Sequence, residues 1–172
     1  MDLARPPKGA FSALLLAQIG AHAAKKFAER LAPLKLAPAH AGILRRLSLS
    51  SALSQRELAA QLGMHASRLV GVIDEMQSMG LVVREGNTGD RRTNSLRLTD
   101  QGNEMLGQIR IISQQHNEDL CSALNEEERV TLTSLLQRIA DQQGLIRGVH
   151  PGYKTLGSRN AGDPGAPRRR QP

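Results

Sequence analysis

The chain has 172 residues, of which 40% are hydrophobic and 2% aromatic, enough for one domain or one domain with an appendage. Lysine and arginine outnumber the acids by 23 to 16, a formal net charge of +7, which favours a polyanionic partner. The scarcity of aromatic side chains disfavours proteins that stack single-stranded or RNA bases on aromatic platforms. A lone cysteine, Cys121, excludes an intrachain disulfide and gives no zinc-ligand spacing.

The N-terminal segment is predicted to form one long helix. Arg5 and Lys8 precede an apolar run, and residues 21–23 (Ala-His-Ala) resemble a signal-peptide cleavage site. An i, i+4 row of apolar residues nevertheless continues through this point: Phe11, Leu15, Ile19, Ala23, Phe27 and Leu31. We therefore expect a helix over residues 9–31 that ends before Pro33. No run is long enough to span a membrane, and we expect a cytoplasmic protein.

Three further helical patterns follow closely. Pro38 suits the first position of a helix, and Ser54-Gln-Arg-Glu57 is a capping box that begins a short one. After a turn at residues 63–65, a fourth helix runs to Met79, with an apolar face made by Leu69, Val72, Ile73 and Met76. Helix, three-residue turn and helix is the spacing of a helix-turn-helix.

Residues 80–100 contain the most informative pattern of the chain. Two short apolar runs, 81–83 and 96–98, flank a turn-rich loop that carries Asp90, Arg91 and Arg92, and this predicts a β-hairpin. A charged tip alone is common in exposed hairpins. Directly after a helix-turn-helix, however, it is typical of a winged helix that presents cations to a DNA groove.

The C-terminal third is predicted to contain two helices and a tail. Thr99 can cap a long helix, and Asn125 begins a second capping box of a helix that reaches about Gln143. From Gly144 onward Gly, Pro, Arg and Ser dominate, so we expect disorder. Five cations against one acid in residues 150–172 suit a tail that contacts DNA phosphates, although a passive tail is an equal alternative.

The fourth helix carries polar and small residues away from its apolar face. His65, Ser67, Arg68 and Gly71 lie there, towards its N-terminal half, where a recognition helix reaches base edges. Gly71 is unfavourable within a helix and indicates close approach to something. Taken alone, the same residues fit an ordinary solvated face equally well.

Four segments together resemble one known family. They are Ser-Gln-Arg-Glu-Leu-Ala-Ala-Gln-Leu-Gly at 54–63, Ser-Arg-Leu-Val-Gly-Val-Ile-Asp-Glu-Met at 67–76, Gly-Leu-Val-Val-Arg at 80–84, and Asp-Arg-Arg followed by Leu-Thr-Asp-Gln-Gly up to residue 102. Their order and spacing resemble the MarR family of winged helix-turn-helix transcriptional regulators. Each segment alone is weak evidence for this family, but the four segments in this order and spacing are specific to it.

The resemblance implies a mainly α fold with a small β-hairpin. A winged helix-turn-helix domain, 37–100, would lie between dimerisation helices in 1–36 and 101–147, and a disordered basic tail, 148–172, would follow. It also implies a homodimer that binds a pseudo-palindromic operator in double-stranded DNA, as a repressor relieved by a small phenolic or lipophilic ligand.

Particular residues match the family's DNA-binding positions. Ser67 and Arg68 match the recognition helix. Arg91 and Arg92 match the wing, where an arginine enters the minor groove, and Asp90 matches the acid that orients it. Arg84 matches the arginine at the foot of the wing, which is either structural or bound to phosphate.

The ligand pocket of the family lies where the dimerisation helices meet the winged domain. Here that region would involve His22, Lys26, His40 and Arg45, which could hold a phenolate or carboxylate beside apolar walls. The alternative, which we favour, is that these residues simply cover a helix junction.

Other functions are less well supported. The chain has no phosphate loop, no metal-ligand cluster and no nucleophile beside a plausible histidine base, so we expect no enzyme, no cofactor and no metal. A winged helix can also be a protein-protein interaction module, but arginines on both helix and wing disfavour this. A redox sensor at Cys121 is disfavoured, because family members with such a cysteine carry it near the start of the first helix.

Overall fold

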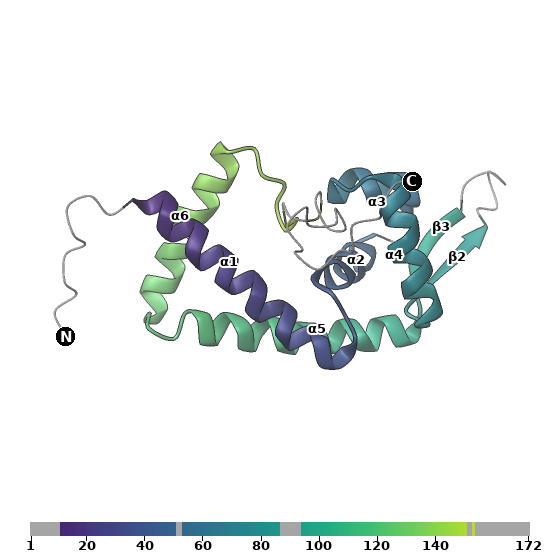
Figure 1. Ribbon diagram of the computed structural model, residues 1–172, viewed down its shortest axis with the longest axis horizontal. Helices are drawn as coiled ribbons and strands as arrows, with labels where there is room; N and C mark the ends of the chain where they lie inside the picture. Colours follow the sequence, from purple (N-terminus) through teal and green to yellow (C-terminus); the bar gives the residue numbers. More distant parts are fainter. Residues whose placement is uncertain (1–10, 51–52, 87–93, 151–152, 154–172) are drawn as a thin grey trace, which may run out of the picture.

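The computed structural model describes residues 11–50, 53–86, 94–150 and 153. The fold is mainly α with a small antiparallel sheet, as predicted (Figure 1). In chain order the elements are α1 (Ser12–Leu31), a 3-10 helix (Ala32–Leu34), α2 (Pro38–Ser48), β1 (Leu53–Ser54), α3 (Gln55–Leu62), α4 (Ala66–Ser78), β2 (Val82–Gly86), β3 (Asn94–Leu98), α5 (Asp100–Leu120) and α6 (Glu126–Gln142).

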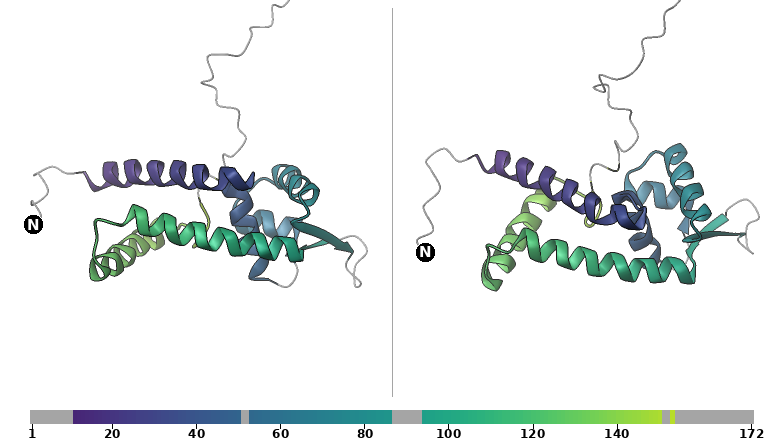
Figure 2. Two further views of the ribbon diagram at one scale, coloured as in Figure 1. Left: turned by 90° about the horizontal axis from the view of Figure 1, so that it is seen from below. Right: turned by 60° about the horizontal axis from the view of Figure 1, so that its bottom comes forward.

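The elements form a winged-helix end and a long-helix end. α2, α3, α4 and the sheet lie together, whereas α1 and α5 run side by side away from them and α6 lies at the far end (Figures 1 and 2). The sheet order is β1-β3-β2, with Arg84 and Leu53 both opposite Leu96. The two-residue strand β1 was not predicted, because only its pairing with β3 defines it.

Local sequence signals account for the helix boundaries. The Ser54 hydroxyl accepts a hydrogen bond from the Glu57 amide at 3.2 Å, and the Glu57 carboxylate accepts one from the Ser54 amide at 2.8 Å. This capping box lowers the pKa of Glu57 through the backbone hydrogen bond. Gly63 (φ +63°) ends α3 and Gly80 (φ +70°) follows α4, both in the left-handed region that favours glycine.

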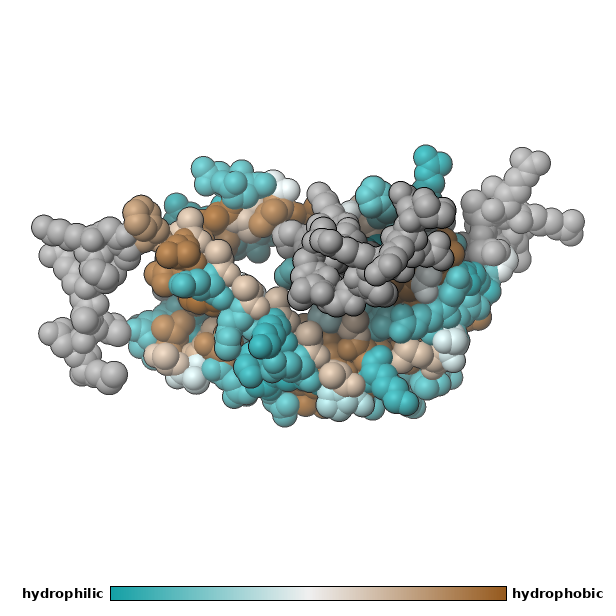
Figure 3. Space-filling model, in the orientation of Figure 1, coloured by the Kyte–Doolittle hydropathy of each residue, from teal (hydrophilic) through white to brown (hydrophobic). Residues whose placement is uncertain are grey.

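The core lies inside the winged-helix end. The fully buried side chains come from α2, α3, α4 and β3, together with the end of α1, and include Leu31, Leu44, Leu58, Leu69, Ile73 and Leu96. α6, which the structure describes in full, has no buried residue. Large apolar side chains are instead exposed on α6 and on the N-terminal half of α1, where brown residues gather in Figure 3.

Two residues of the predicted tail, 148–172, lie against the core. Val149 packs against the core and Tyr153 belongs to it, with only 7% of its surface exposed. The physical reason is that these two apolar side chains fill space beside α2, which composition alone does not reveal. The remainder of the predicted tail, residues 154–172, lies outside the described residues. No described helix is both long enough and apolar enough to cross a lipid bilayer.

Candidate nucleic-acid interface

The helix-turn-helix exposes the N-terminal half of α4. His65 is the N-cap residue of α4 and makes no side-chain capping hydrogen bond with the described residues. His65 and Ser67 are both exposed, as expected for a recognition helix. An uncapped helix N-terminus with an exposed hydroxyl can bind a phosphate or reach a base edge.

Arg68 lies at the edge of this surface. Its side chain is half-buried, and its Nε atom is buried without a hydrogen-bond partner among the described residues. A buried guanidinium nitrogen without a partner is costly. Arg68 therefore lies partly within the fold, at the edge of the surface that His65 and Ser67 expose.

Gly71 lies on the same exposed face of α4. A Cβ atom built at this position would have no heavy atom of the described residues within 4 Å. The fold itself therefore does not require a glycine here. The close approach that the sequence indicates would therefore be made to another molecule.

Arg84 connects the wing to the recognition helix. Its Nη2 donates to the Asp74 carboxylate at 2.5 Å, and its Nη1 donates to the Gln77 side chain. Arg84 is only 22% exposed, whereas Asp74 is 57% exposed. Of the two roles left open by the sequence, these contacts favour the structural one, in which Arg84 fixes β2 against α4.

The tip of the wing lies outside the described residues, because Asp90, Arg91 and Arg92 fall within 87–93. The stem of the hairpin is described up to the Gly86–Asn94 pair. A cation that the sequence analysis missed lies on this stem, since Arg97 donates to the Glu85 carboxylate at 3.0 Å. The alternation of residues along the strand could have indicated it.

The four predicted ligand residues do not come together. His22 and Lys26 are exposed on α1, where Lys26 pairs with Glu29 at 3.0 Å. His40 is buried, and its Nδ1 accepts a hydrogen bond from the Ala37 amide at 3.0 Å. Its ring is therefore used to cap α2. His22 and Lys26 share one face of α1, four residues apart, whereas His40 and Arg45 belong to α2.

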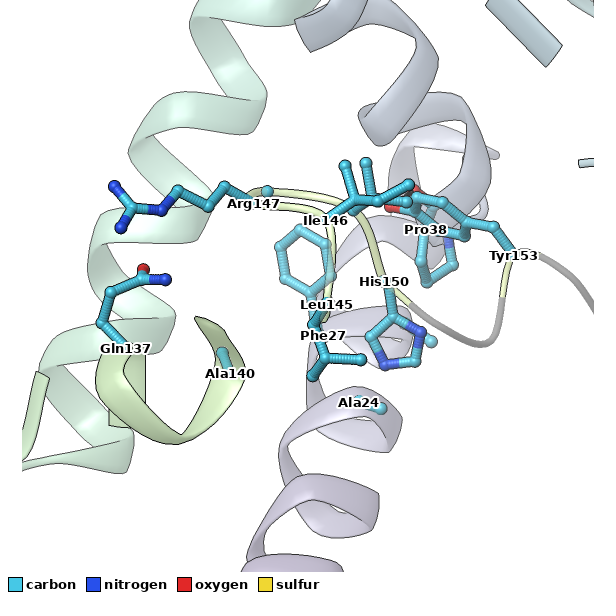
Figure 4. Close-up of a pocket in the computed structure, with 13 residues that line it drawn as sticks. Ala24, Phe27, Pro38, Gln137, Ala140, Leu145, Ile146, Arg147, His150 and Tyr153 are labelled. Carbon is cyan, nitrogen blue, oxygen red and sulfur yellow. Dashed lines mark hydrogen bonds between the residues drawn. The ribbon is translucent and has the colours of Figure 1, made fainter. Parts of the chain in front are cut away.

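Two adjacent cavities lie at the predicted junction. The larger, about 680 Å³, lies between α1, the end of α6 and the segment after it (Figure 4). The smaller, about 350 Å³, lies between α2 and α5 and contains Arg45 and Arg110 beside apolar walls. Phe27 and Tyr153 line both cavities. Neither residue was predicted from the sequence to line a pocket, although Tyr153 is the single tyrosine of the chain.

Cys121 is the C-cap residue of α5 and is partly exposed. α5 ends at this residue and a short turn leads to α6. The side chain is therefore less enclosed by neighbouring residues than it would be in the middle of a helix. None of the described contacts involving Cys121 indicates a redox role.

The helix-turn-helix, the hairpin that follows it and the flanking helices define a winged helix-turn-helix protein. A profile of the MarR family matches residues 34–93. A Thauera aromatica protein, named as a candidate transcriptional regulatory protein for the hcr operon, is 32% identical over 101 residues, 59% of this chain and 61% of that protein. The alignment thus spans about three fifths of the length of this relative.

Solved structures agree with the profile. The transcriptional repressor CouR, bound to a 23-mer DNA duplex, is 28% identical with a TM-score of 0.69, covering 81% of this chain and 99% of CouR. A mutant of MarR from E. coli complexed with operator DNA has the same fold, with 24% identity, a TM-score of 0.65 and coverage of 74% and 91%. The profile match and these structures together support the MarR family of winged helix-turn-helix transcriptional regulators for this chain.

Proposed function

We propose that this protein is a sequence-specific regulator of transcription that binds a pseudo-palindromic operator in double-stranded DNA as a cytoplasmic homodimer. It acts as a repressor that a small phenolic or lipophilic ligand releases from DNA. The relatives named above support the DNA-binding part, because CouR and MarR have both been solved with DNA.

One observation carries the DNA-binding proposal. The N-terminal half of α4 combines a helix end without a side-chain cap, an exposed Ser67 and a half-buried Arg68 at the edge of the same surface. Anions are stabilised at helix N-termini, and arginine provides a fork of donors for phosphates and guanines. In the proposal, α4 enters the major groove while Arg91 and Arg92 of the wing contact the adjacent minor groove and Asp90 orients them.

The exposed apolar surfaces support the homodimer. Leu135 and Ile139 of α6 are 48% and 43% exposed, and Leu15 and Ile19 of α1 are 50% and 55% exposed. Contiguous apolar patches of this kind mark interaction sites in proteins that are otherwise stable in water. A second copy of the chain would cover both helices and place two α4 helices for two half-sites.

The effector is proposed to bind at the junction cavities. Arg45 and Arg110 offer positive charge to a phenolate or carboxylate, while Phe27, Leu106 and Ile109 provide an apolar surface for a ring or chain. The position also suits relief of repression, because the cavities lie between the long helices and α2 of the winged domain.

Titration of fluorescently labelled duplexes tests the proposal. Anisotropy is followed with a duplex from the upstream region of the protein's own gene and with a random duplex, each at two salt concentrations. We expect the upstream duplex to bind at least about 10³-fold more tightly, with sedimentation giving one dimer per duplex. Equal affinity for both duplexes would refute sequence-specific binding, and no binding to either would favour a protein-protein interaction module.

A further inference from the structure

The segment after α6 returns to the winged domain. We call residues 144–150 together with Tyr153 the C-terminal strap. Gly144, with φ +65°, reverses the chain after α6, and the Leu145 amide donates to the Ala140 carbonyl at 3.0 Å. Figure 1 shows this yellow-green segment leaving α6 and running towards α2. Arg147 fixes its start by donating two hydrogen bonds to Asp141, at 3.1 and 2.6 Å.

Tyr153 occupies a notch in α2. Its hydroxyl donates to the Pro38 carbonyl at 3.1 Å, and the side chain is 7% exposed. Gly42, about one turn further along α2, provides the space. A Cβ atom at residue 42 would lie 2.5 Å from the tyrosine oxygen and 2.8 Å from two ring carbons. The ring therefore fits only because residue 42 has no side chain.

A second glycine, Gly148, lies where the strap passes Arg45. Its φ of +71° favours glycine, whereas a Cβ atom there would make only an ordinary contact, 3.6 Å from the Arg45 guanidinium. Two glycines that are distant in sequence thus allow the same segment to lie against α2. The strap therefore packs at a defined site on α2 and is not a loosely attached terminus. We call the contact of Tyr153 with Gly42 and Pro38 the seat of Tyr153.

The seated tyrosine separates the two junction cavities. Tyr153, Phe27 and Gly148 line both the cavity of about 680 Å³ and the cavity of about 350 Å³. Figure 4 shows Tyr153 and Ile146 on the strap side of the larger cavity and Phe27 on the α1 side. Withdrawal of the tyrosine ring would join the two spaces and open the apolar one towards Arg45.

The notch is also next to a contact with the recognition helix. His40 caps the first turn of α2, and its Nε2 lies 3.3 Å from the Glu75 carboxylate on α4. The Pro38 carbonyl that accepts from Tyr153 belongs to this same turn. The strap and α4 are therefore both attached to the N-terminal turn of α2.

We propose that the C-terminal strap is a conformational latch. With Tyr153 seated, α6 is tied to α2 in the arrangement that binds DNA. A small molecule that fills the joined cavity unseats the tyrosine, releases α2 and weakens DNA binding. The effect of the strap on DNA binding rests on the proposed function, whereas the burial of Tyr153 against α2 is measured without DNA.

Intrinsic fluorescence measures the seat directly, because the chain has one tyrosine and no tryptophan. We expect acrylamide to quench the wild-type protein several-fold less than a free tyrosine amide. Gly42→Ala should raise quenching to the level of the free amide. Gly107→Ala is the matched control, since this helical glycine has no described atom within 4 Å of a built Cβ, and it should leave quenching unchanged.

Operator affinity then tests the latch. Gly42→Ala and Tyr153→Ala should each weaken binding about tenfold, a typical coupling between sites, whereas Gly107→Ala should not. The double variant should bind no more weakly than Tyr153→Ala, because the tyrosine is already absent. Multiplying effects in the double variant, or equal quenching of wild type and Gly42→Ala, would overturn the latch. Protected Tyr153 in a protein that binds no duplex would instead refute the proposed function and leave the seat intact.

Discussion

Replacing Arg84 with methionine separates its structural role from a contact with DNA phosphate. The substitution keeps the aliphatic stem but removes the hydrogen bonds to Asp74 and Gln77. Because Asp74 is 57% exposed, solvent screens the pair. We therefore expect a loss of about 1 kcal/mol in unfolding free energy, which lowers the Tm of a chain of this length by about 2–4 °C.

The salt dependence of DNA binding gives the discriminating measurement. Each phosphate contact contributes about 0.9 to the slope of log K against log salt, so one arginine per subunit would contribute about 1.8 in a dimer. If Arg84 only orients the wing, Arg84→Met weakens operator binding with an unchanged slope. Asp74→Asn should then reproduce the stability loss, and the double variant should add little to it.

Arg97→Met is the matched control, because Arg97 lies on the same hairpin and its side chain is 54% exposed. It should change the unfolding free energy by less than about 0.5 kcal/mol. A slope that falls by about 1.8 in Arg84→Met, with wild-type thermal stability, would show that Arg84 binds phosphate. That result would refute the structural assignment.

Three further outcomes are expected. Gly71→Ala should stabilise the free protein by up to about 1 kcal/mol while weakening operator binding, and a gain in affinity would exclude close approach of DNA there. His116 packs against Phe27, and burial, followed by repulsion from Arg30, lowers its pKa. The folded protein should therefore lose stability as the pH falls below 6.5, and His116→Gln should lessen that loss in urea titrations. Removing residues 154–172 should reduce the salt slope, by up to about 5 if three arginines per chain bind phosphate, without changing the ratio of operator to random affinity; an unchanged slope means a passive tail.

The elements that depend on neighbouring residues were predicted well from the sequence. Thr99 was expected to cap α5, and its hydroxyl accepts from the Gly102 amide at 2.9 Å while donating to the Gly80 carbonyl at 2.6 Å. A Cβ atom at Gly102 would lie 2.1 Å from the Leu81 carbonyl oxygen. The Leu-Thr-x-x-Gly segment is thus explained by the corner between wing and α5, where only glycine fits.

Features that depend on distant partners were predicted poorly. The sequence could not show that the His40 ring would cap α2, because a capping histidine and a ligand-binding histidine look alike in one chain. Tyr153 was assigned to a disordered tail because its neighbours are glycine, proline and polar residues. Its burial depends on the notch at Gly42, which is 111 residues earlier in the chain.

α6 follows every local rule for a helix and yet buries none of its residues. Its apolar face therefore needs a partner, and the strap extends from the end of this same helix. If a second copy holds α6 in place, loss of the dimer should also loosen the seat of Tyr153. Leu136→Glu places a carboxylate on this face, where an unpaired buried charge costs several kcal/mol. We expect monomers by sedimentation and acrylamide quenching raised towards that of Gly42→Ala. Monomers in which acrylamide quenches Tyr153 no more than in the wild type would show that the burial of Tyr153 does not depend on the second copy.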